Sequence, residues 1–113
     1  MKKTLFAASF IILTGCFSAK LITPVQADVE RVQSKFPNYS LADLTQGKTL
    51  YEQHCGSCHG LKKPSSRTEE KWETIVPKMA VKANKKYPNS LDADSQEKIL
   101  KYLITMGSAT AAR

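Results

Sequence analysis

The chain has 113 residues, which is room for one small domain. A domain of this size buries a modest fraction of its surface, so it often relies on a disulfide, a metal or a cofactor for stability. The sequence has 17 Lys and Arg against 10 Asp and Glu, a net charge of +7 that becomes +5 once Lys2 and Lys3 of a targeting segment are set aside. With one Trp and no Arg-rich stripe, this composition argues against nucleic acid as a partner and suits an acidic protein or an anionic surface.

The first 15 residues have the pattern of an export signal. Lys2 and Lys3 form a short positive segment, and residues 5–13 follow as an apolar run. This run is too short for a membrane span, which needs about 20 residues. Residues 1–15 are therefore predicted to be a signal peptide, and the protein is expected to face the periplasm.

Two processing sites are compatible with this signal. Residues 13–16, LTGC, resemble the lipobox of bacterial lipoproteins, in which the Cys becomes the lipidated first residue. Residues 25–27, VQA, resemble an ordinary cleavage site, and cleavage after Ala27 would release a soluble periplasmic protein. The three Cys are an odd number for an exported protein, and two of them lie in one C-x-x-C motif. Lipidation gives Cys16 a role of its own, so we favour a lipid anchor at this residue.

Residues 16–40 are predicted to form a tether, because they contain Pro24, Pro37 and scattered charges and show no sustained periodicity. The folded domain is expected over residues 41–113. Its first predicted helix covers residues 42–54, with Ser40 and Asp43 as a capping signal. Gly47 interrupts this helix at a cost of about 1 kcal/mol relative to Ala, which predicts a close approach by another helix.

Two more helices are predicted. One begins near Thr68, with Ser66 and Glu69 at the spacing of a capping box, and Pro77 is expected to kink or restart it. The other spans residues 94–106 and is expected to stop at Gly107. No pair of strands is indicated, so the predicted fold class is all-α.

Cys55, Cys58 and His59 stand in the spacing C-x-x-C-H. A dithiol redox couple needs a thiolate at a helix N-terminus just after a strand, whereas this motif follows a predicted helix. A structural zinc site needs four ligands, and His54, next to the first Cys, is the one further candidate. Covalent haem uses all three residues of the motif, because the two thiols can add to the two vinyl groups of one porphyrin while the His lies beneath the iron.

With this motif, the export signal and the flanking helices, the chain resembles the class I monohaem c-type cytochromes, which are small exported electron carriers. The resemblance covers residues 43–106. It implies three to four helices around one covalently attached haem c, with thioether bonds at Cys55 and Cys58 and His59 as the proximal iron ligand. It also implies that the helix before the motif crosses the last helix, with Gly47 against Tyr102.

Met79 and Met106 are the two candidates for the second iron ligand. Met79 lies at helical spacing with Trp72, Ile75 and Val76, a stripe that can be ordinary core or the wall of the haem pocket. Met106 ends the last helix, which in the resembling family packs away from the distal face. We therefore favour Met79. A second ligand closes the iron for electron transfer, whereas an open site binds dioxygen or peroxide.

Two further residues have expected roles next to the haem. Trp72 is either core or a donor from its indole N–H to a haem propionate. The resemblance implies that a backbone carbonyl of the segment ending at Pro64 holds the His59 ring in one orientation.

Eight basic residues lie between Lys62 and Lys86, against three acidic ones. They form either a solvated helix face or a surface that steers an acidic redox partner. The sequence therefore predicts a lipid-anchored monohaem cytochrome c that carries single electrons and is not an enzyme. The alternatives are a haem protein with an open distal site, peroxidase-like or gas-binding, and, third, a thiol–disulfide oxidoreductase.

Overall fold

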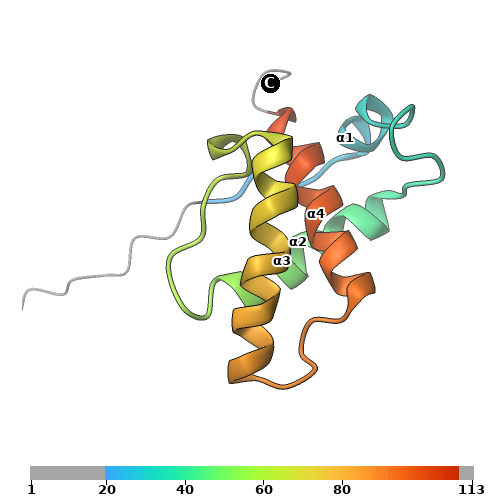
Figure 1. Cartoon of the computed structure of the whole chain (residues 1–113). Coiled ribbons are helices and arrows are strands. Elements are labelled where there is room, and N and C mark those ends of the chain that lie inside the picture. The colour runs from blue at the N-terminus through green and yellow to red at the C-terminus, as the bar shows by residue number, and fades with distance from the viewer. Residues whose placement is uncertain (1–19, 110–113) are drawn as a thin grey trace, which may run out of the picture.

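The computed structural model describes residues 20–109, so the expected signal peptide and Cys16 lie outside the described residues. Within this range the chain forms helices and no strand: α1 (Gln26–Arg31), α2 (Leu41–Cys55), the short 3-10 helix η1 (Pro64–Ser66), α3 (Glu69–Lys86) and α4 (Ala93–Gly107). The all-α prediction is confirmed. Figure 1 shows α3 and α4 side by side, with α2 crossing behind them and α1 at one end. None of the helices between residues 20 and 109 has the length and apolar character that a membrane span needs.

The crossing of α2 and α4 forms the centre of the fold. α2 begins after Ser40, whose Oγ accepts from the backbone N–H of Asp43, while the Asp43 carboxylate accepts from the N–H of Ser40, both at 3.0 Å. A Cβ on Gly47 would lie 2.4 Å from the carbonyl oxygen of Lys98 and 2.8 Å from the Cβ of Tyr102. Only Gly permits so close an approach, and the predicted contact between Gly47 and Tyr102 is confirmed.

α3 is one continuous helix with Pro77 inside it, so the helix does not restart at Pro77, one of the two effects expected there. Pro77 lacks the N–H that would bond to the carbonyl of Glu73, but both residues are exposed, so water can satisfy that carbonyl. The predicted cap is wrong by two residues. Thr68 caps the helix by accepting from the N–H of Lys71 at 3.3 Å, whereas Ser66 lies in η1.

α4 begins one residue before the predicted start, because Asp92 accepts from the N–H of Ser95 at 2.8 Å and caps it. Its last residue is Gly107, the predicted stop, and Ser108 is its C-cap. Its buried face contributes to the whole length of the core.

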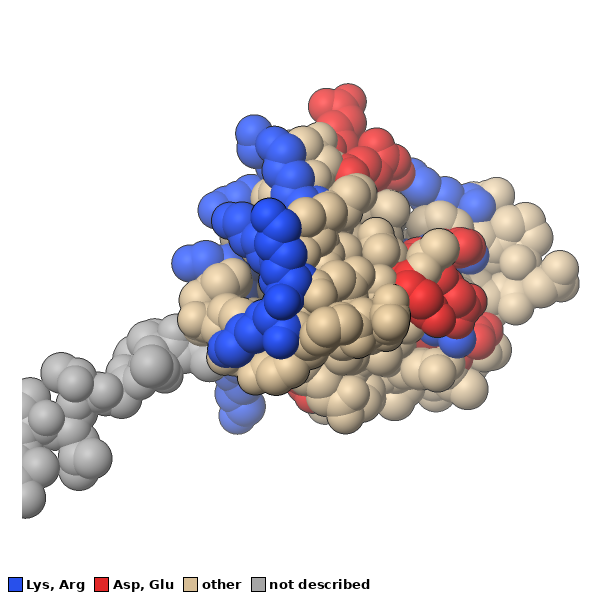
Figure 2. All heavy atoms as spheres, turned by 60° about the horizontal axis from the view of Figure 1, so that its bottom comes forward, with Lys and Arg blue, Asp and Glu red and all other residues tan. Residues whose placement is uncertain are grey.

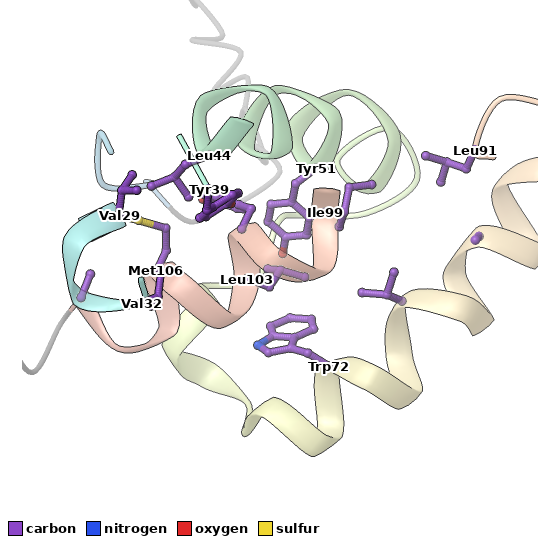
Figure 3. Close-up of a cluster of buried hydrophobic side chains, with 14 residues drawn as sticks. Val29, Val32, Tyr39, Leu44, Tyr51, Trp72, Leu91, Ile99, Leu103 and Met106 are labelled. Atoms are coloured by element: carbon purple, nitrogen blue, oxygen red, sulfur yellow. The ribbon is translucent and has the colours of Figure 1, made fainter. Parts of the chain in front are cut away.

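The core has two ends, which Figure 3 shows towards opposite ends of α4. Near α1, five buried side chains pack together: Val29, Val32, Tyr39, Leu44 and Met106. Towards α3 and the loop before α4 lie Tyr51, Trp72, Leu91, Ile99 and Leu103. We call these groups the closed end and the open end, because the second one borders a cavity.

α1 belongs to the closed end, which corrects the expectation of a tether over residues 16–40. Asp28 and Val29 are each 1% exposed. Arg31 ties α1 to the end of α4: it donates to the Asp28 carboxylate at 2.9 Å, to the Thr105 carbonyl at 2.9 Å and to the Ser108 hydroxyl at 3.0 Å. These partners at the end of α4 lie 74 and 77 residues away in the sequence, so no local sequence pattern indicates the contact.

Candidate cofactor site

A cavity of about 510 Å³ opens between the end of α2, the inner face of α3 and the middle of α4. Pockets for organic ligands commonly measure about 300–1,000 Å³ and are mostly apolar. The apolar part of the wall comes from three helices and from the loop before α4, through Tyr51, Trp72, Ile75, Val76, Ala80, Ala83, Leu91, Ile99 and Leu103.

The C-x-x-C-H motif lies at the rim of this cavity. Cys55 is the last residue of α2 and is half-buried, whereas Cys58 and His59 follow in the exposed loop, and all three line the cavity. His54 lines it as well. The residues that sequence spacing grouped are therefore at one cavity wall, and a large apolar ligand in the cavity would contact both thiols and the imidazole.

The two candidate Met residues have different positions. Met79 lines the cavity from α3, on the same helix face as Ile75 and Val76. Met106 is 3% exposed and lies at the closed end beside Val29, outside the residues that line this cavity (Figure 3). Only Met79 of these two thioethers is therefore positioned at the cavity.

The protonation of the Cys55 thiol bears on the redox alternative. Burial, and to a smaller extent the nearby Cys58, raises the pKa of Cys55 to about 11. A thiol–disulfide oxidoreductase needs the opposite, a lowered pKa that keeps its nucleophile as thiolate near neutral pH. At neutral pH Cys55 is a protonated thiol, which disfavours that alternative.

Tyr51 holds the loop that carries the motif, a role that the sequence did not reveal. Its hydroxyl donates to the carbonyl of Lys62 at 2.7 Å and accepts from the N–H of Lys62 at 3.1 Å. The ring packs edge-to-face against Trp72, with 6.5 Å between centroids. Burial raises the pKa of Tyr51 to about 12, so the phenol stays neutral and can keep both bonds.

Trp72 is part of the core, the first of the two roles expected for it. Its indole N–H donates to the carbonyl of Pro64 at 2.8 Å rather than pointing at a propionate. Pro64 ends the segment of which a backbone carbonyl was expected to orient His59. The Nδ1 atom of His59 pairs with the carbonyl of Gly60 at 2.9 Å. Trp72 therefore ties α3 to η1 and thereby fixes the cavity wall next to the motif.

The charges around the cavity are of one sign. Lys62, Arg67 and Lys82 line it, and no acidic residue is among its lining residues within the described part of the chain. Figure 2 shows the same asymmetry on the surface, with Lys and Arg along one side of the face and Asp and Glu on the other. Haem is a flat apolar ring with two carboxylates, so the apolar wall, the cationic rim and the two thiols fit this group.

A comparison with protein families gives a match to the model described as Cytochrome c, over residues 44–112. The comparisons with curated proteins and with solved structures give no match. The matched range is more than half of the chain and contains every residue that lines the cavity. The cofactor of this domain is a covalently attached haem c with its iron. The chain therefore belongs to the cytochrome c family and is a haem-binding electron carrier.

Proposed function

We propose that this protein is a monohaem cytochrome c that carries one electron at a time in a membrane-linked chain of the periplasm. One observation carries the proposal: an apolar cavity is lined both by the C-x-x-C-H motif after α2 and by Met79 from α3. Ligands from two separate elements allow the iron to be bound on both sides. An iron without a free position suits electron transfer rather than oxygen or peroxide chemistry.

Each residue has one role in this proposal. Cys55 and Cys58 hold the porphyrin through thioether bonds, His59 is the proximal ligand and Met79 the distal one. When bound, the haem supplies a one-electron couple at its iron. The chain keeps water away through its apolar wall, and a thioether ligand in such surroundings raises the reduction potential. Tyr51 keeps the attachment loop in place through its two bonds to Lys62.

The absorbance spectrum of the exported protein tests the distal ligand. We expect the oxidised protein to show the weak far-red band of an iron–methionine sulfur bond, and Met79→Ala to lose it. Met106→Leu is the matched control and should keep the band, because Met106 lies at the closed end. A wild-type spectrum that is high-spin and changes rapidly with carbon monoxide would favour the open-site alternative. A band that survives in Met79→Ala would contradict the assignment.

The position of α1 supports lipidation at Cys16 over cleavage after Ala27. Cleavage after Ala27 would cut inside α1 and remove Val25, whose N–H donates to the Asp28 carboxylate at 2.9 Å. It would also remove Pro24, which is buried. Lys20, the first described residue, follows Cys16 by four positions, a length of chain that spans at most about 14 Å. A lipid on Cys16 would hold the domain close to the membrane surface.

Phase separation in detergent tests this attachment. The wild-type chain should enter the detergent phase, and Cys16→Ser should remain in the aqueous phase with an unchanged haem spectrum. Equal partitioning of both proteins into the aqueous phase would contradict the lipid anchor and favour a soluble periplasmic form.

The cations at the cavity support an acidic redox partner. Lys62, Arg67 and Lys82 lie where electrons would enter or leave, and further lysines line the exposed face of α3. Complementary charge speeds an encounter without making the complex tight. The rate of reduction by an acidic donor protein should therefore fall as ionic strength rises. A rate that does not depend on salt would contradict the steering role.

A further inference from the structure

The loop between α3 and α4 is held mainly by one side chain of α3, Asn84. Its Nδ2 donates to the carbonyl of Leu91 at 3.0 Å, and its Oδ1 accepts from the N–H of Leu91 at 2.9 Å. The same oxygen accepts from the hydroxyl of Ser90 at 3.2 Å. Asn84 therefore satisfies both backbone groups of Leu91, as a neighbouring strand would.

The rest of this loop offers little other support. Residues 87–90 form a turn in which the N–H of Ser90 donates to the carbonyl of Tyr87 at 3.2 Å, and Tyr87, Pro88 and Asn89 are exposed. One further bond reaches Leu91, from Nε2 of Gln96 to the same carbonyl at 3.1 Å. The position of Leu91 thus depends on Asn84 for its N–H and on Asn84 and Gln96 for its carbonyl.

Leu91 is the residue of this loop that reaches the cavity. It is 4% exposed and lines the cavity together with Ala80 and Ala83, which lie on the last turns of α3. Ala side chains are small, so Leu91 supplies apolar bulk that these two residues lack. Without Leu91 in place, the space next to Ala80 and Ala83 would open towards solvent.

We propose that Asn84 is a positioning residue that holds Leu91 as an apolar plug over the α3 end of the haem cavity and so keeps water and small ligands from the iron. The proposal rests on the proposed function, in which the haem occupies this cavity. An Asn is suited to the task because one amide group both donates and accepts. The isosteric Asp would still accept from the N–H of Leu91 but would set its second oxygen against the Leu91 carbonyl.

The rate at which carbon monoxide binds to the reduced holoprotein tests the plug, with Met79→Ala present in every protein compared so that the proposed distal ligand does not limit the rate. Leu91→Ala removes the plug itself, and Asn84→Ala removes what holds it. Both variants should raise the rate by roughly tenfold; for Asn84→Ala this corresponds to the loss of one hydrogen bond of ordinary strength. The double variant should add little to either, because both changes act through the same side chain. Asn84→Asp, which preserves the shape, should raise the rate less and serves if Asn84→Ala does not fold.

Hydrogen exchange at the Leu91 amide gives a second measurement that does not depend on ligand binding. Exchange should be faster in Asn84→Ala and unchanged in Asn89→Gly, a control in the same loop that keeps its turn. If Asn84→Ala lowers the melting temperature but leaves the carbon monoxide rate equal to that of Met79→Ala alone, Asn84 only supports the fold and the proposal is wrong. If Leu91→Ala also leaves the rate unchanged, Leu91 is not a plug. A wild-type protein without a haem spectrum would overturn the proposed function itself.

Discussion

Both ends of the core consist of buried, mostly apolar side chains, but one end is packed shut and the other borders a cavity. At the closed end, Val29 of α1 and Met106 of α4 are 1% and 3% exposed, and α1 closes this end of the core. At the open end, Trp72 and Ile99 are 4% and 1% exposed, yet they border about 510 Å³ of cavity. α4 contributes to both ends. The polypeptide therefore completes one half of its own core and leaves the other half for the cofactor, which makes haem a structural part of the domain.

We expect the largest loss of stability when the attachment thiols are removed, because the open end then has no cofactor to complete it. In the double variant Cys55→Ala/Cys58→Ala, the cavity loses its covalently held cofactor. Without haem, the apolar wall of this cavity of about 510 Å³ faces water, and the free energy of burying it under the cofactor is lost. A small domain is stable by about 5–15 kcal/mol in total, so the loss of half of its core contacts is large on this scale. We expect no cooperative thermal transition in circular dichroism. Cys16→Ser is the control and should melt like the wild type, whereas a normal transition in the double variant would contradict the comparison.

Removing the Arg31 side chain, which joins α1 to α4 at the closed end, should cause the next largest loss of stability. Arg31→Met takes the guanidinium away from Asp28, a carboxylate that is 1% exposed, and breaks the bonds to Thr105 and Ser108. Breaking a buried pair costs about 3–5 kcal/mol, and because Arg31 is partly exposed we expect about 3 kcal/mol in urea unfolding. The haem spectrum should not change, because Arg31 lies at the other end of the core. Arg31→Lys keeps the charge but not the forked donors, so its free energy of unfolding should lie between those of the wild type and Arg31→Met. A shifted spectrum would show that the two ends are coupled.

Much of the helical framework was predictable because its signals are local. Ser40 and Asp43 are three residues apart and form the capping box that their spacing indicates. The C-x-x-C-H spacing brings its three side chains to one cavity wall because they follow one another at the end of α2. The failures are non-local. α1 is stable through Arg31 and its distant partners on α4, and no sequence window contains both.

At the site, the hydrogen bonds that the sequence did not indicate also join residues through backbone atoms. The partner of the Trp72 indole is a backbone carbonyl, whose position depends on the path of the loop. The bonds of Tyr51 and Asn84 also go to backbone atoms, those of Lys62 and Leu91. Every residue has such atoms, so the sequence carries no signature of these bonds. The one signal that could have indicated Asn84 is a polar residue on the inner face of a helix, next to a Pro-Asn turn.

Tyr51→Phe should have a smaller effect whose size depends on pH. At neutral pH the variant loses the two bonds to Lys62, at about 1 kcal/mol each. Burial raises the pKa of Tyr51 from 10.0 to about 12, so the folded protein disfavours the phenolate. The stability from keeping this phenol neutral is fully present below pH 10 and is lost as the pH rises towards 12. The difference between wild type and variant in urea midpoint should therefore narrow above pH 10.

Tyr39→Phe is the matched control for this pH dependence. Burial raises the pKa of Tyr39 to about 12 as well, but this residue lies at the closed end. The Tyr39→Phe variant should reduce the alkaline loss of stability in the same way and leave the haem spectrum unchanged at neutral pH. A difference between wild type and Tyr51→Phe that stays constant across the alkaline range would mean that the hydrogen bonds alone determine the effect of Tyr51.

The smallest expected effects come from a turn that occurs once at each end. Phe36-Pro37-Asn38-Tyr39 and Tyr87-Pro88-Asn89-Ser90 share the order aromatic, Pro, Asn, and their Asn residues have φ of 63° and 59°. In both turns the fourth N–H donates to the first carbonyl, at 3.3 and 3.2 Å. This is a type II turn, with Pro at its second position and a left-handed residue at its third. Replacing either Asn by Ala should cost about 1 kcal/mol, and Gly should restore the loss.

The two turns share their backbone geometry. A difference between Asn38→Ala and Asn89→Ala in stability or hydrogen exchange therefore reflects the end of the core that surrounds each turn. Asn38→Ala should lower the urea midpoint alone, since the surrounding closed end is packed and α1 covers it. Asn89→Ala should lower the midpoint equally and also speed hydrogen exchange at the Leu91 amide, which follows the turn by one residue and borders the cavity. Equal exchange at Leu91 in both variants would mean that Asn84 fixes Leu91 without help from the turn, and that the open end is as firmly held as the closed one.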